Sequence, residues 1–105
     1  MTSELLLEKF KAAGIPAYLD AVPAGATRFV GMTPILSNAI RGGDSVLLES
    51  EVVQLDICAP TRSDNIVNDV KDVLQNDFIM WETDTPMSYD SEFKLYRAIL
   101  SVELY

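Results

Sequence analysis

The stretch that decides the fold is EVVQLDICAPTRSDNIVNDVKDVLQ, residues 51–75. In its first part, apolar and polar residues alternate, which is the period of a strand with one buried face. That face comprises Val53, Leu55, Ile57 and Ala59. After Pro60 the period changes to that of a helix. The apolar stripe of this helix comprises Ile66, Val67, Val70, Val73 and Leu74. The stretch therefore predicts a strand over Val46–Ala59, followed by an amphipathic helix that begins at Thr61 or Ser63 and ends near Gln75.

Further elements are expected on both sides of this stretch. A helix is predicted over residues 3–13, capped by Thr2 or Ser3 and ended by Gly14. Four more segments have the composition of strands: 17–19, 28–35, 78–83 and 93–105. Two polar or glycine-bearing segments are predicted as connections: a mobile loop over Ser37–Ser45, and Asp84–Glu92.

The order of these elements predicts a single domain over residues 1–105. Two helices cannot cover both faces of a sheet of this size, so both are expected on one face. The predicted fold class is a two-layer α+β domain with a mostly antiparallel sheet of four to five strands. In the last strand, the face expected to meet the helices comprises Tyr96, Ala98, Leu100, Val102 and Leu104.

The charge of the chain is strongly negative. Sixteen acidic residues against eight basic ones give a net charge of −8 at pH 7. The excess is uneven, because Asp44 to Glu92 holds twelve acidic residues and two basic ones. This balance disfavours phosphate binding, and therefore nucleic acid and anionic membrane surfaces as direct partners. It predicts one strongly negative side of the molecule.

The sequence also lacks the usual signals for export or membrane insertion. No basic-then-apolar segment opens the chain, and no apolar run approaches the roughly 18 residues of a membrane span. We therefore expect a protein that has no membrane contact and stays where it is made. One cysteine excludes an internal disulfide bond, which fits a reducing cytoplasm.

Candidate catalytic residues are few. Histidine is absent, which removes Ser-His-Asp and Cys-His nucleophile arrangements and the commonest metal ligand. Cys58 could be a reactive thiol, but Asp56 on the same strand face discourages thiolate formation, so a structural cysteine is favoured. We predict that the protein is not an enzyme and uses no cofactor.

Four acidic residues surround the predicted connection after residue 83: Glu82, Asp84, Asp90 and Glu92. They could bind Ca²⁺ or act as paired carboxylates. Their spacing does not match a calcium loop, and nothing marks one carboxylate as buried and its neighbour as wet. A solvated acidic edge without a metal is the favoured interpretation. Asp69 and Asp72 are likewise predicted to lie on the solvent-exposed face of a helix.

Glycines and aromatic residues offer two more candidates. Gly42-Gly43 is read as a flexible turn, because no Gly-Lys-Ser/Thr follows as a phosphate loop requires. Tyr96 is expected in the core. Trp81 and Tyr89 could belong to the core or to a partner surface, where aromatic residues are enriched.

Several of these features together resemble the tail terminator, or tail-completion, proteins of long-tailed bacteriophages and prophages. The likeness is carried by the short N-terminal helix with its Gly-Ile-Pro exit and by the loop Arg41-Gly42-Gly43-Asp44. The strand-to-helix stretch of residues 51–75 and the closing strand of residues 93–105 complete it. These segments cover most of the chain.

The resemblance implies a structural assembly protein without catalytic residues. Such a subunit forms a ring, typically a hexamer, that caps the finished tail tube and joins it to the head connector. The implied partners are further copies of the chain, a tail tube protein and a head–tail connector protein. The implied location is the host cytoplasm during assembly and then the virion tail.

Two sets of residues are expected to serve such a ring. The predicted subunit or partner interface comprises Arg41, Gly42, Gly43, Asp44, Trp81 and Tyr89. The predicted acidic channel surface comprises Glu82, Asp84, Asp90 and Glu92. A negative channel wall would repel phosphates and keep DNA moving.

Two other classes stay open. One is a non-enzymatic adaptor or regulatory domain that acts as a monomer or dimer, which an oligomer measurement separates from a ring former. The other is a small enzyme using carboxylates, which a buried carboxylate pair in a deep pocket would support.

Overall fold

The computed structural model describes the backbone of residues 1–42 and 45–105, and the side chains of residues 1–35 and 51–105. The elements follow one another as two helices and five strands: α1 (Ser3–Ala12), β1 (Ala17–Leu19), β2 (Phe29–Gly42), β3 (Ser45–Ala59), α2 (Ile66–Asn76), β4 (Trp81–Asp90) and β5 (Leu95–Leu104). No helix in the described part of the chain is long and apolar enough to span a membrane.

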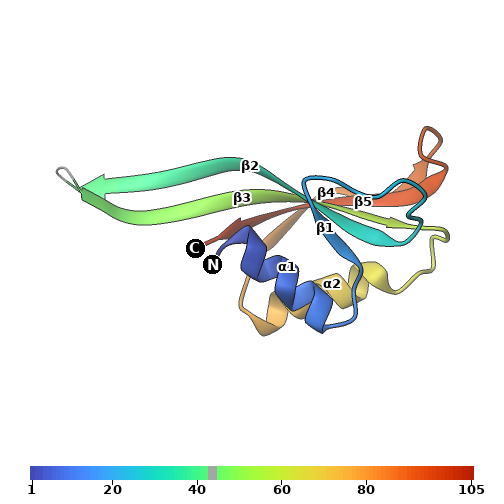
Figure 1. The fold of residues 1–105 in the computed structure, drawn as a ribbon, viewed down its shortest axis with the longest axis horizontal. Coiled ribbons are helices and arrows are strands. Elements are labelled where there is room, and N and C mark those ends of the chain that lie inside the picture. Colours follow the sequence, from blue (N-terminus) through green and yellow to red (C-terminus); the bar gives the residue numbers. More distant parts are fainter. Residues whose placement is uncertain (43–44) are drawn as a thin grey trace.

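The five strands form one sheet in the order β1-β2-β3-β5-β4. β1 pairs with β2 in parallel, and the other three pairings are antiparallel. Both helices lie on the same face of this sheet (Figure 1). The predicted fold class is therefore confirmed: an α+β domain with a mostly antiparallel five-stranded sheet and two helices on one face.

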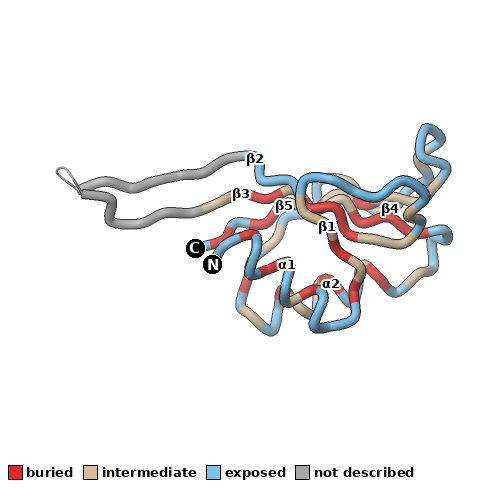
Figure 2. Tube along the Cα trace, in the orientation of Figure 1, coloured by how far each residue is buried: buried red, intermediate tan, exposed pale blue. Residues whose placement is uncertain are grey.

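The core lies between the sheet and the helices (Figure 2). It contains the predicted strand faces, with buried side chains at Val53, Leu55, Ile57 and Ala59 of β3 and at Ala98, Leu100, Val102 and Leu104 of β5. The helices contribute Leu6 and Phe10 from α1 and Ile66, Val70 and Leu74 from α2. The predicted strand faces and the predicted stripe of α2 are thus confirmed, although Tyr96, Val67 and Val73 are only half-buried.

The start of α2 differs from the prediction. The helix begins at Ile66, several residues after Thr61 and Ser63. Asp64 explains the delay, because its carboxylate accepts a hydrogen bond from the Ile66 N–H at 2.9 Å. A side chain that satisfies a backbone donor in this way competes with an earlier helical turn. The same carboxylate pairs with Arg28 at 3.0 Å and so ties the loop before β2 to the helix start.

The predicted mobile loop over Ser37–Ser45 is wrong for most of its length. β2 continues to Gly42 and β3 begins at Ser45, and the two strands pair from Ser37↔Glu51 to Gly42↔Ser45. Pairing satisfies the backbone groups that the two segments turn toward each other, which outweighs the weak strand preference of their glycine and polar residues. Gly43 and Asp44 lie outside the described residues.

The predicted connection over Asp84–Glu92 is also wrong, because β4 runs from Trp81 to Asp90. β4 is an edge strand, and its register with β5 shifts between Thr83 and Ser88. Pro86 lies within this irregular part, where a residue without an N–H is tolerated. Residues 78–80, which precede β4, are not part of a strand.

Candidate interaction surfaces

The most distinctive feature of the molecule is a two-stranded ribbon that projects from the sheet (Figure 1). β5 ends its pairing with β3 at Glu51, and β1 ends its pairing with β2 at Met32. Beyond these points, within the described chain, residues 38–42 and 45–50 pair only with each other. We call these residues the arm. At roughly 3.4 Å per residue its backbone extends roughly 17 Å, and the longest dimension of the molecule is 50 Å against 27 and 23 Å.

The arm is anchored at its root by a part-buried hydrogen bond. The Ser3 hydroxyl at the start of α1 donates to the Glu51 carboxylate of β3 at 2.9 Å. Ser3 is the one buried polar residue among the described side chains. The contact ties the helix layer to the point at which the arm leaves the sheet.

The face of the sheet opposite the helices carries a hollow of about 690 Å³. Its floor includes Gly31 and Cys58, and its apolar walls come from Tyr18, Val22, Phe29 and Phe93. The loop over residues 20–28 lies close to the sheet at Gly31, where a Cβ would meet Val22 Cγ2 at 3.4 Å, an ordinary van der Waals contact. We call this feature the hollow.

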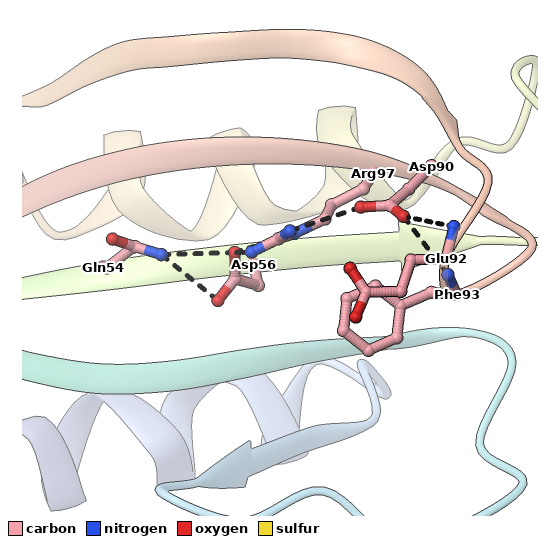
Figure 3. Close-up of polar contacts among 6 residues, drawn as sticks. All are labelled: Gln54, Asp56, Asp90, Glu92, Phe93 and Arg97. Atoms are coloured by element: carbon pink, nitrogen blue, oxygen red, sulfur yellow. Dashed lines mark hydrogen bonds and ion pairs between the residues drawn. The ribbon is translucent and has the colours of Figure 1, made fainter.

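A polar network braces one wall of the hollow (Figure 3). Arg97 of β5 donates to Asp56 of β3 at 2.7 Å and to Asp90 at the end of β4 at 3.4 Å. Gln54 also donates to both Asp56 oxygens at 3.3 Å. Hydrogen bonding to Asp56 raises the pKa of Arg97. The guanidinium is thus committed to two carboxylates and acts as a brace rather than as an anion site.

Asp90 also organises the turn between β4 and β5. One of its oxygens accepts from the backbone N–H groups of Phe93 at 3.2 Å and Glu92 at 3.0 Å (Figure 3). The Phe93 N–H contributes most to lowering the pKa of Asp90 below its usual value, and Arg97 adds to the effect. The turn that carries Phe93 to the hollow is therefore held by an ionised carboxylate.

Cys58 lines the hollow but is only 4% exposed. Burial raises the pKa of its thiol to about 11, against the opposing attraction of Arg97. Such a thiol stays protonated at neutral pH and is a poor nucleophile. The structural interpretation of Cys58 is consistent with this environment.

The four acidic residues of the predicted channel surface do not form one cluster. Glu82 and Asp84 lie exposed near the start of β4, and Asp84 accepts a hydrogen bond from the Ser101 hydroxyl. Asp90 lies at its far end and Glu92 lies in the turn after it; the β5 partners of Glu82 and Asp90 are six residues, or roughly 20 Å, apart. Among the described side chains, no group of three His, Cys, Asp or Glu residues is arranged to hold a metal ion.

The residues of the predicted interface are also dispersed. Arg41 and Gly42 lie at the far end of the β2 part of the arm. Trp81 packs partly buried against the core, whereas Tyr89, at the other end of β4, is exposed and stacks edge-on against Tyr96 at 5.4 Å. Of the remaining two, neither Gly43 nor Asp44 falls within the described residues.

Sequence reasoning missed the two most exposed large apolar side chains of the described chain. Phe78 is 93% exposed and Met80 is 82% exposed, while Ile79 between them is buried. We call Phe78 and Met80 the knob. The predicted strand over residues 78–83 includes them, whereas β4 begins only at Trp81.

Comparison with models of known protein families gave no match, and comparison with curated proteins gave no significant match.

Proposed function

We propose that this chain is a structural subunit that assembles with copies of itself into a ring, as the resemblance to phage tail terminators suggests. In that role the ring caps the tail tube and joins it to the head connector, with a tail tube protein and a connector protein as partners. The observation that carries the proposal is the arm.

The arm supports assembly because a two-stranded ribbon is marginally stable by itself in water. Within the described chain, neither a third strand nor a helix backs residues 38–42 and 45–50. Both outer edges of the ribbon present backbone donors and acceptors, which another chain can pair. An arm that reaches from one subunit to a different surface of the next makes a head-to-tail contact, the type that closes into rings.

The proposal is tested by measuring mass in solution and then shortening the arm. Because Ser37 and Glu51 are directly paired, residues 38–50 can be replaced by Asn-Gly, which closes a two-residue hairpin at that pair. We expect the unaltered chain to form a closed oligomer by light scattering coupled to gel filtration. The shortened chain should be a folded monomer whose circular dichroism spectrum loses only the signal of the removed strand residues and whose unfolding stays cooperative.

The negative charge of the subunit suggests how such a ring would interact with DNA. A subunit of net charge −8 repels phosphates, so its channel would not retain the passing duplex. Glu82→Lys and Asp84→Lys, at exposed positions of β4, test this point. Together they should leave the ring intact and make it retain DNA at low salt, whereas the unaltered ring should not.

The same negative charge favours a second candidate, an adaptor that docks onto a basic partner as a monomer or dimer. For an adaptor, the two lysine substitutions should abolish partner binding and leave DNA affinity negligible. A chain that stays monomeric at every concentration and salt tested, even with a tail tube protein present, would exclude the ring and leave the adaptor.

A further inference from the structure

The two helices end in the same backbone motif, but with different residues at its critical position. After α1, the N–H of Gly14 bonds the Lys11 carbonyl at 3.0 Å, and the N–H of Ile15 bonds the Phe10 carbonyl at 2.9 Å. This pair of bonds defines a Schellman motif, in which the first residue past the cap is left-handed. Gly14 has φ +79°, as the motif requires.

After α2 the same pair of bonds recurs. The N–H of Phe78 bonds the Gln75 carbonyl at 3.0 Å, and the N–H of Ile79 bonds the Leu74 carbonyl at 2.8 Å. The left-handed position is therefore Phe78, with φ +57°. A bulky side chain is disfavoured in this conformation, where glycine is the usual residue.

Burial does not offset this penalty at Phe78. Its side chain is 93% exposed, and Met80 on the same side of the segment is 82% exposed. Glycine at position 78 would serve the described fold at least as well. An apolar side chain that strains the backbone and stays in water is explained by a contact outside the chain.

The hollow is the surface that fits the knob. The knob precedes the first residue of β4, and the turn that follows β4 carries Phe93 and Lys94 to the hollow. Trp81 and Asp90, the two ends of β4, pair with Val102 and Leu95 of β5, so seven residues of β5, or roughly 23 Å, separate the two features. A chain therefore cannot fill its own hollow, and insertion into a second copy produces a head-to-tail contact.

The chemistry of the two surfaces is complementary. Tyr18, Phe29 and Phe93 offer aromatic faces and edges to a phenyl ring and to a thioether sulfur. The charged residues that line the hollow cancel, since Asp20 and Asp56 are matched by Lys94 and Arg97. Two molecules of charge −8 repel each other generally, but not at this site.

We propose that the knob of one copy inserts into the hollow of the next copy. This contact rests on the proposed function, because it requires that the chain assembles with itself. The contact does not involve the arm. Because each copy gives its knob to one neighbour and its hollow to the other, all subunits have the same orientation around the ring axis.

The first test removes the knob and leaves the arm intact. Phe78→Gly should raise the dissociation constant of the assembly roughly thirtyfold or more, as truncation of a central aromatic anchor does. The thermal midpoint of the monomer should stay unchanged or rise. Leu5→Ser removes an exposed apolar side chain from α1 and serves as the matched control, with no effect on association.

The second test blocks the hollow. Val22→Glu places a charge among its apolar walls at an exposed loop position, and should weaken association as Phe78→Gly does. A mixture of the two variants retains one intact knob and one intact hollow. The mixture should therefore associate more tightly than either variant alone.

The outcomes separate the two proposals. An unaltered chain that stays monomeric overturns the proposed function and this contact with it. An unaltered chain that assembles, with Phe78→Gly assembling equally well, overturns this contact alone. A mixture that associates no better than its components overturns the pairing of knob with hollow.

Discussion

The two helix ends predict substitutions of opposite sign at equivalent positions. Gly14→Ala places a Cβ on a residue whose φ is +79°. No heavy atom lies within 4 Å of that Cβ, so the substitution creates no clash. Its effect on stability is therefore conformational alone, which makes the magnitude calculable.

The loss at Gly14 has two parts. A non-glycine residue in the left-handed conformation costs about 1–2 kcal/mol. Alanine also lowers the conformational entropy of the unfolded chain, which stabilises the folded protein by about 0.4–1 kcal/mol. The free energy of unfolding should therefore fall by about 0.5–1 kcal/mol. Phe78→Gly reverses both terms and should raise the free energy of unfolding by a similar amount.

Urea denaturation followed by circular dichroism measures both changes, with the slope of the transition unchanged. The protein must be dilute enough to be monomeric, because assembly would add its own stabilisation. Gly14→Asn is the matched control and should lose less than Gly14→Ala, since asparagine tolerates the left-handed region better. A neutral Gly14→Ala together with a destabilising Phe78→Gly would refute the reasoning.

Three further predictions concern the core, the thiol and the turn. Leu100→Ala, at a fully buried position of β5, should reduce the free energy of unfolding by about 2–4 kcal/mol in the same urea assay. Cys58 should resist alkylation in the folded protein at pH 8. The pKa of Cys58 rises from 9.0 to about 11 on folding. Its contribution to the free energy of unfolding is therefore fully present below pH 9 and should decline as the pH rises toward 11. Folding lowers the pKa of Asp90, so its contribution to the free energy of unfolding is present at neutral pH and should be lost as the pH falls below 3.8. In the Asp90→Asn variant, stability should therefore depend less on pH in this acidic range.

The layer that meets the helices could be predicted from the sequence because its signals are periodic and local. Alternation along residues 53–59 and the helical stripe of residues 66–74 each require that one face be buried. Both faces are buried as expected, and the two-layer arrangement follows from the number of helices.

The arm and β4 could not be predicted in the same way. Gly42 and Gly43 are strong turn signals, but local preference does not reveal how far the segments on either side pair with each other. Pro86 and the polar residues around it look like a connection. An edge strand tolerates them because one side of its backbone has no strand to bond.

The hollow depends on contacts between segments distant in the sequence, and no local pattern encodes it. Val22 lies over Gly31, a proximity that only the folded loop reveals. The knob left a partial signal, since the left-handed position that ends many helices is usually filled by glycine and sometimes by asparagine. Once the end of α2 is known, Phe78 is anomalous at that position.

The motif that strains Phe78 also presents it for binding. Ile79 is buried and its N–H is bonded to the Leu74 carbonyl at 2.8 Å, so the segment is held to the end of α2. With Ile79 directed into the core, Phe78 and Met80 must point outward. A knob held in position before contact loses little conformational entropy on binding. We therefore expect Ile79→Ala, which loosens this support while leaving both knob side chains in place, to weaken association mainly through a faster dissociation rate. Surface plasmon resonance with immobilised chain would measure that rate, and unchanged binding would show that Ile79 does not hold the knob for binding.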